Sequence, residues 1–234
     1  MAARRPRRRS PAARVEDAVG RLLAALPLPE AERRRRDLDL RRTPRRVAET
    51  WLGDLLDGYG ADPAAILGET MPAAGRDLVA VTGIDFHSMC PHHLLPSRGV
   101  AHVAYLPRGK VVGFGQIARL VDCFAHRLVL EEDLARRVAE ALVRHLGARG
   151  AAVVLDAEQA CLSVRGERRL RARTHAQCFL GALDRDAALQ RRFLALVASG
   201  PSGSARPGHR ARRRPGSRSP GRGAAGRTRP ASRA

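Results

Sequence analysis

Two arginine-rich ends without an acidic residue limit which part of this 234-residue chain can fold. Residues 1–14 hold six arginines and residues 200–234 hold ten, with Gly, Pro and Ser where a domain would have apolar residues. Such segments bury too little apolar surface to offset the entropy lost on ordering. The sequence therefore predicts disordered tails at 1–14 and 200–234 around one domain at 15–199.

The tails supply sixteen of the formal +20 net charge. Arginine-rich segments attract nucleic acid and other polyanions, so we expect nucleic-acid binding, if there is any, only through these tails. Neither tail contains an aromatic residue, which excludes base stacking there. The chain has no apolar run long enough for a transmembrane helix, and we expect no membrane contact and a cytoplasmic location.

Between the tails, helical and strand-like patterns are mixed. Residues 15–26 and 43–58 show helical apolar spacing, and Thr43 and Pro44 suit a helix start. Further helices are predicted near 116–128, 131–147 and 184–198, and strands near 77–88, 99–107, 110–115, 151–166 and 171–183. Without a strict strand–helix–strand alternation, this order indicates an α+β fold.

A cysteine and two adjacent histidines lie together in the stretch "SMCPHHLLPS". Cys90 and His93 are spaced so that a thiolate and an imidazole converge on one ion, and zinc accepts both. The pair alone also fits a buried thiol beside a solvated histidine. A zinc site needs at least one more ligand from elsewhere in the chain.

Cys161 is the best candidate for that third ligand. Cys123 and Cys178 lie among apolar neighbours and suit a protein core, whereas Cys161 stands among polar residues, close to Arg165, where a thiolate is favoured. Three protein ligands leave a fourth position for water, as in catalytic zinc sites. His92 would then be a proton-transfer group beside the metal.

The stretches "FHSMCPHHLLPSRGVAHVAYLP", "GKVVGFGQIARLVDCFAHRL" and "CLSVRG" resemble GTP cyclohydrolase I, as does "TPRRVAETW" upstream. The resemblance covers roughly residues 40–198. It implies a tunnelling fold with an antiparallel sheet, helices on one face and N-terminal helices up to about residue 60, followed by the catalytic part at about 75–199. It also implies a toroidal homo-oligomer, a decamer in bacterial members.

The family converts GTP to formate and 7,8-dihydroneopterin triphosphate, the first step toward tetrahydrofolate and other pterins. By resemblance, Cys90, His93 and Cys161 match the zinc ligands and His92 matches a catalytic histidine. Glu132 falls where the family holds the guanine edge, and a carboxylate can accept hydrogen bonds from both guanine N–H donors there. Arg119 and Arg165 fall on triphosphate-binding arginines, and bidentate phosphate contact suits them.

Three positions depart from the family pattern. Gln159 stands where the family has a second catalytic histidine, and glutamine cannot exchange protons near pH 7. Gly115 and Gln116 replace a serine–lysine pair that faces phosphate, and Gln116 is predicted to contact the substrate there. His175 lies in an altered strand and is a candidate to replace the missing histidine. Two alternatives stay open: a related zinc enzyme for a less phosphorylated purine or pterin, and a catalytically silent zinc-binding oligomer with a regulatory role.

Overall fold

The computed structural model of the chain describes residues 9–36, 38–165 and 168–199. The tail predicted at 200–234 and residues 1–8 of the tail predicted at 1–14 lie outside the described residues, so disorder and polyanion binding there stay predictions. Helix α1 (Pro11–Ala25) begins inside the predicted N-terminal tail and earlier than the expected start at Val15. It does so because the Ser10 side chain accepts a hydrogen bond from the Ala13 amide at 3.2 Å, which caps the helix.

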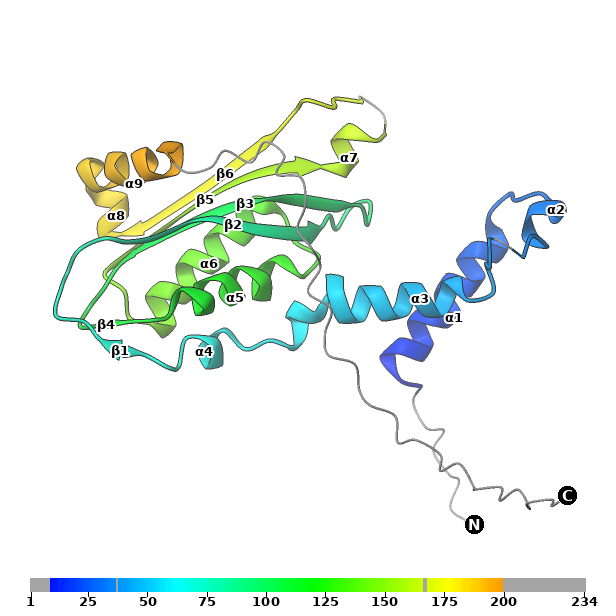
Figure 1. Cartoon of the computed structure of the whole chain (residues 1–234), viewed down its shortest axis with the longest axis horizontal. Coiled ribbons are helices and arrows are strands. Elements are labelled where there is room, and N and C mark those ends of the chain that lie inside the picture. Colours follow the sequence, from blue (N-terminus) through cyan, green and yellow to red (C-terminus); the bar gives the residue numbers. More distant parts are fainter. Residues whose placement is uncertain (1–8, 37, 166–167, 200–234) are drawn as a thin grey trace, which may run out of the picture. The chain divides into compact units, whose positions relative to one another are not determined.

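A four-stranded antiparallel sheet forms the centre of the fold, in the order β2–β3–β5–β6 (Figure 1). Its strands are β2 (Val79–Met89), β3 (Pro96–Leu106), β5 (Gly150–Gln159) and β6 (Thr174–Gly181). The register pairs Met89 with Pro96 and Ser97 with Gln159. The β2–β3 turn and the end of β5 therefore lie at the same end of the sheet.

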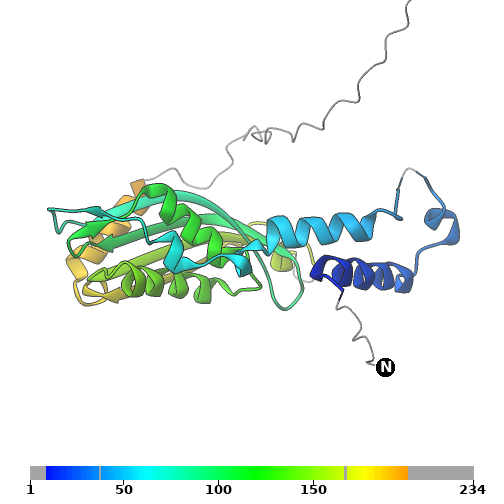
Figure 2. The same ribbon diagram turned by 90° about the horizontal axis from the view of Figure 1, so that it is seen from below.

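Helices α5 (Phe114–Ala125) and α6 (Glu131–His145) lie side by side on one face of this sheet (Figures 1 and 2). Both bury an apolar stripe against alternate residues of the strands, which is how a sheet with one helical layer builds its core. Helix α6 ends where Gly147 adopts φ 72°, as the sequence predicted. The largest fully buried side chains of this core include those of Tyr105, Leu67, Ile117, Leu120, Leu134, Leu142, Leu146, Leu155 and Val103.

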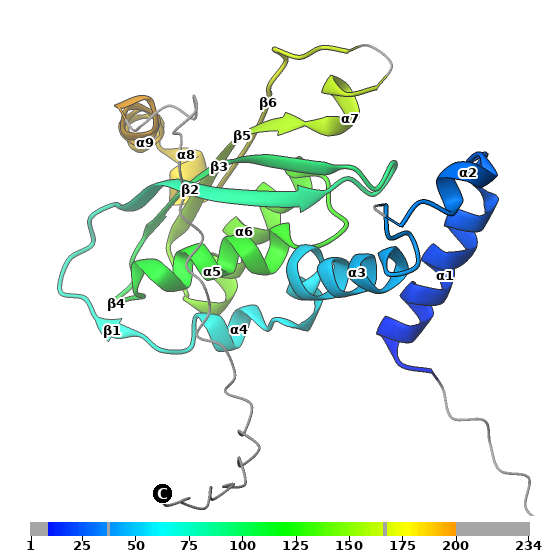
Figure 3. The same cartoon turned by 45° about the vertical axis from the view of Figure 1, so that its right-hand side comes forward.

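The expectation of helices on one face only is wrong. Helices α8 (Ala182–Arg185) and α9 (Ala187–Ser199) pack on the opposite face (Figures 1 and 3). A second apolar cluster explains this, because Leu183 and Phe193 are both fully buried against strand residues that point away from α5 and α6. Those strand residues are Ala104, Leu106 and Ala152.

The segments before the sheet are short helices and one small strand pair. Helix α1 packs against α3 (Thr43–Thr50), which continues into a π-helical turn η1 (Trp51–Leu55) and a 3₁₀ turn η2 (Asp57–Gly60). Thr43 is the first helical residue of α3 and makes no capping hydrogen bond, so its predicted capping role is wrong. Two further short helices are α2 (Glu30–Arg33) and α4 (Pro63–Ile66).

The strand predicted at 110–115 is shorter than expected. Only Lys110–Val111 form a strand, β4, which pairs with β1 (Met71–Pro72), and α5 begins at Phe114.

None of the helices in 9–36, 38–165 and 168–199 combines the length and apolar character needed to cross a membrane.

Candidate active site

The β2–β3 connection holds the Cys-x-His-His stretch in a tight turn. The Leu94 amide donates to the Cys90 carbonyl at 3.0 Å, and the Cys90 amide donates to the Leu95 carbonyl at 2.9 Å. Leu94 adopts φ 52°, a left-handed conformation that is uncommon for a residue with a branched side chain. The turn leaves the Cys90 thiol buried and the rings of His92 and His93 exposed.

Cys161 reaches the same place from another part of the chain. Strand β5 ends at Gln159, opposite Ser97, and helix α7 (Ala160–Ser163) follows at once. The ligand atoms of Cys90, His93 and Cys161 all lie within 4.8 Å of one another. The Cys90 Sγ and the His93 Nδ1 are 3.9 Å apart.

Two thiols and one imidazole are a donor set that suits zinc. Burial raises the pKa of the Cys161 thiol, and the neighbouring Cys90 sulfur raises it further, while the Arg165 charge lowers it. Both sulfurs must be deprotonated to bind a metal, and two thiolates so close together need a cation between them. The two thiolates and the imidazole therefore form a donor set that fits a zinc ion.

A buried carboxylate beside this cluster was missed by the sequence analysis. Glu131, the first residue of α6, is 4% exposed, and its two oxygens accept hydrogen bonds from the Gln159 side-chain amide and the Thr174 hydroxyl, each at 2.6 Å. Gln159 in turn accepts a hydrogen bond from the Ser97 hydroxyl at 2.7 Å. The inward stripe of α6, which includes Leu134 and Val138, places position 131 on the buried face, so helical spacing could have revealed it.

These contacts fix the direction of the Gln159 side chain. Its nitrogen faces Glu131 and its oxygen faces Ser97, with the Cys161 sulfur 3.8 Å from that oxygen. A carboxylate accepts hydrogen bonds only, so Glu131 selects the amide nitrogen of Gln159 and leaves the oxygen toward the sulfur ligand.

Comparison with known proteins agrees with this geometry. A family model described as GTP cyclohydrolase I matches residues 15–198. The chain belongs to the GTP cyclohydrolase I family. A protein named GTP cyclohydrolase 1 from Chromobacterium violaceum is 46% identical over 156 residues, which cover 67% of this chain and 76% of the relative.

One further relative and one solved structure were also compared with the chain. A GTP cyclohydrolase 1 from Ralstonia nicotianae is also 46% identical over 156 residues, covering 67% of this chain and 75% of the relative. Among solved structures, the apo form of the archaeosine synthase QueF-Like has a TM-score of 0.39 and 19% identity, over 47% of this chain and 98% of that chain. A likeness at that level says nothing about the chemistry of this site.

Two of the predicted substrate residues follow directly on residues linked to the cluster: Glu132 follows Glu131, whose partner Gln159 lies beside Cys161, and Arg165 contacts the Cys161 backbone. Glu132 is exposed and adjoins the buried Glu131 at the start of α6. Arg165 is exposed just after α7, and its Nε donates to the Cys161 carbonyl at 3.2 Å. Both side chains are therefore open to a ligand beside the Cys90–His93–Cys161 group.

The other two predicted substrate residues lie on α5. Arg119 is exposed in its second turn. Gln116 is nearly buried, and its amide nitrogen donates to the Ile66 and Glu69 carbonyls at 2.8 and 2.9 Å. Its oxygen accepts from the Gly113 amide at 2.7 Å, so Gln116 holds the start of α5 against the segment after α4. A phosphate contact by Gln116 would require these hydrogen bonds to break.

His175 cannot replace the missing histidine within one chain. Successive side chains of a strand point to opposite faces, so Thr174 and His175 of β6 face opposite ways. Thr174 contacts Glu131 on the helix-covered face, whereas His175 lies 3.8 Å from Asp156 on the other face. The sheet itself separates His175 from Gln159.

The buried carboxylate predicts a pH dependence of stability. Burial, the largest cause, raises the pKa of the Glu131 carboxyl in the folded protein, while the Thr174 hydrogen bond lowers it. A group with a raised folded pKa contributes stability below its unfolded pKa and loses that contribution as the pH rises through the folded pKa. Relative to a Glu131→Gln variant, the wild type is therefore expected to lose free energy of unfolding as the pH rises above the carboxyl's ordinary value of 4.5.

Urea unfolding across a series of pH values measures this difference. Glu132→Gln is the matched control, because it removes the same charge from the exposed neighbouring position. Parallel pH profiles for wild type and Glu131→Gln would contradict the expected effect of burying Glu131.

Proposed function

We propose that this protein is a zinc-dependent GTP cyclohydrolase I, which converts GTP and water to formate and 7,8-dihydroneopterin triphosphate. The observation that carries the proposal is the convergence of Cys90, His93 and Cys161 from two distant segments in a chain of this family. The reaction is the first step of tetrahydrofolate and pterin biosynthesis.

Cys90, His93 and Cys161 are the residues that would hold zinc. When bound, the ion supplies Lewis acidity, which makes a hydrolytic water more acidic near neutral pH. His92, exposed in the same turn, accepts and returns the proton that hydrolysis moves. Gln159 orients a water or the purine through its oxygen, because Glu131 holds its nitrogen.

The substrate is held at both ends. Glu132 accepts hydrogen bonds from N1–H and the exocyclic amine of guanine, both of which point along one edge of the base. Arg119 and Arg165 bind the triphosphate, since the guanidinium fork matches phosphate oxygens. A contribution from Gln116 stays a prediction because the protein's own carbonyls occupy its amide nitrogen.

One structural feature favours a second candidate substrate. With Gln116 bound to backbone carbonyls, α5 offers no lysine where the family resemblance predicts a phosphate-binding cation. A charge-assisted hydrogen bond contributes roughly 1.5–3 kcal/mol. A purine or pterin with fewer phosphates would therefore lose less binding free energy than GTP does from having glutamine at position 116 in place of lysine.

Self-association into a ring, a decamer by family resemblance, is part of this proposal. Strands β2 and β6 are the edges of the four-stranded sheet, and within the described residues the only further pairing at either edge is an isolated bridge between Met89, at the end of β2, and Leu128. Unpaired edges of this length offer backbone donors and acceptors to a second copy. Pairing β2 of one copy with β6 of the next would continue the sheet around a ring. The domain at 15–199 is the unit that would assemble into the ring. Its predicted location stays the cytoplasm.

The test is turnover by purified full-length protein of measured zinc content. Incubation with GTP is expected to release formate, detected by a coupled dehydrogenase, and a pterin that becomes fluorescent after oxidation. GDP, GMP and guanosine serve as matched substrates that differ only in phosphate number. Faster release from GDP or GMP would favour the second substrate, and zinc-loaded protein that yields no formate from any of them would favour the silent oligomer.

A further inference from the structure

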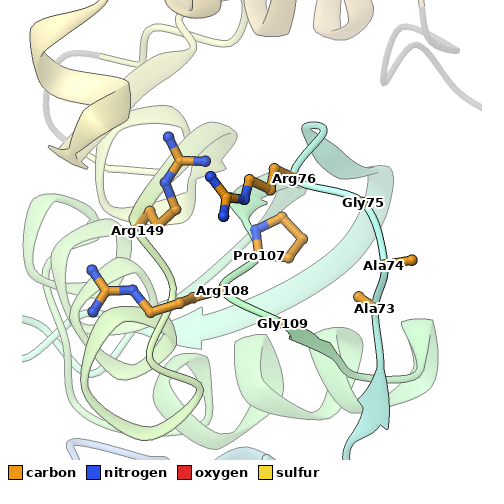
Figure 4. A pocket seen from close by; sticks show the side chains of 8 residues that line it. All are labelled: Ala73, Ala74, Gly75, Arg76, Pro107, Arg108, Gly109 and Arg149. Carbon is orange, nitrogen blue, oxygen red and sulfur yellow. The ribbon is translucent and has the colours of Figure 1, made fainter.

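A cavity of about 540 Å³ lies away from the cysteine cluster, at the other end of the sheet. It is formed where β2 and β5 begin and β3 ends, whereas the cluster lies where β2 and β5 end and β3 begins. Three loops line it, with one arginine on each (Figure 4). The lining residues are Ala73, Ala74, Gly75, Arg76, Pro107, Arg108, Gly109 and Arg149.

Backbone hydrogen bonds hold these three loops together. The Ala73 amide donates to the Gly109 carbonyl at 3.0 Å, and the Arg149 amide donates to the Leu106 carbonyl at 2.9 Å. Gly109 adopts φ 76°, which lets the β3–β4 connection turn tightly. These two bonds tie the start of the 73–76 segment and the Arg149 loop to the connection between β3 and β4.

The guanidinium groups at the cavity have no protein partner in the described part of the chain. The side chains of Arg76 and Arg149 are directed toward each other above Pro107, and the Arg108 side chain extends away from that pair (Figure 4). Asp77, the acid next to Arg76, forms no ion pair with any of them among the described residues. Two like charges that face each other repel, and an anion between them removes that repulsion.

The lining also indicates the kind of anion. Guanidinium forks bind phosphate oxygens in pairs, so two of them suit a ligand with two phosphate groups. The cavity volume falls within the range of small-molecule sites. Apart from the arginines the walls are alanine, glycine and proline, which offer no aromatic ring for a purine base to stack on. Recognition therefore rests on charge and not on a base.

We propose that the cavity between Arg76 and Arg149 is a binding site for a diphosphate or longer oligophosphate, with Arg108 at its rim. It is separate from the Cys90–His93–Cys161 site, and the proposal does not rest on the proposed function. The oligophosphate comes either as the free inorganic ion or as part of a nucleotide, and the phosphates are the part that is bound.

Calorimetric titration of the full-length protein with inorganic pyrophosphate tests this proposal. The arginine-rich tails and the substrate arginines also attract the probe, so the comparison is between two double variants that keep them. Arg76→Ala with Arg149→Ala removes the facing pair. Arg191→Ala with Arg192→Ala removes two exposed arginines from α9 and is the matched control.

The pocket variant is expected to bind pyrophosphate about 10²-fold more weakly at the cavity, from two lost charge-assisted contacts. The α9 variant is expected to stay within about twofold of wild type, because exposed charges without a partner contribute little. Zinc content is measured before and after titration, since pyrophosphate also binds metals. Unchanged pyrophosphate binding by the pocket variant overturns the proposal, as does an equal loss in the α9 variant.

A parallel titration with ADP distinguishes the two sources of the phosphates. If ADP and pyrophosphate bind with equal affinity and the pocket variant loses both, the free inorganic ion is sufficient for binding and the nucleoside adds nothing. Tighter binding of ADP that is lost in the same variant identifies a nucleotide. GTP turnover by the pocket variant without added pyrophosphate is expected to match wild type, so the failure of this site and the failure of the proposed function give different results.

Discussion

Replacing Cys161 with alanine is expected to abolish stoichiometric zinc binding and to lower formate release from GTP by at least about 10³-fold. Cys161 is one of only three groups whose ligand atoms converge within 4.8 Å in the described part of the chain. Without it, Cys90 and His93 remain as a two-ligand pair on one turn. A Lewis acid supplies several kcal/mol of stabilisation to the reaction, and about 1.4 kcal/mol corresponds to each tenfold change in rate.

Metal analysis and the formate assay on the same preparation measure both effects. Cys178→Ala is the matched control, since that thiol lies on β6 among apolar neighbours of the main core. It is expected to keep zinc and most of the activity. Circular dichroism establishes that both variants fold. Full zinc content and wild-type turnover in Cys161→Ala would remove the basis of the proposed function.

Replacing His92 with alanine is expected to lower the rate constant for GTP turnover by roughly 10²–10⁴-fold while zinc stays bound. His92 and His93 are neighbours whose rings lie 6.2 Å apart at an angle of 70°, so the two imidazoles face different directions. The His93 ring lies beside the Cys90 and Cys161 sulfurs, whereas the His92 ring is exposed next to it. Gln159 cannot take over this task, because an amide does not titrate near neutral pH.

The pH–rate profile separates a proton-transfer role from a structural one. The limb due to an imidazole should disappear in His92→Ala, and added imidazole should restore part of the rate. His145→Ala, at the last turn of α6, is the control and is expected to leave both profile and rate unchanged. A loss of zinc in His92→Ala, or an unaltered profile, would contradict the proposed role.

Much of the fold followed from patterns within single elements. The helical stripes predicted α5 and α6, and strand-like stretches, valine-rich for β2 and β3, predicted β2, β3, β5 and β6. Local spacing failed where an element depends on its surroundings. The short strand β4 stops at Val111, shortly before α5 begins at Phe114, and the far face of the sheet is covered because Leu183 and Phe193 pack against the strands there.

The amino-acid sequence by itself determined the residues available for chemistry: Cys90, His92 and His93 in one turn, Cys161 far along the chain, and a glutamine at position 159. Only the tertiary structure decided which of them meet. The register of β3 against β5 sets Ser97 beside Gln159 and so brings the two metal-ligand segments to one end of the sheet. The same packing buries Glu131 instead of its neighbour and places His175 on the far face. Spacing along a chain specifies what one turn or one strand presents, whereas the meeting of distant segments depends on strand register and on which face each residue takes.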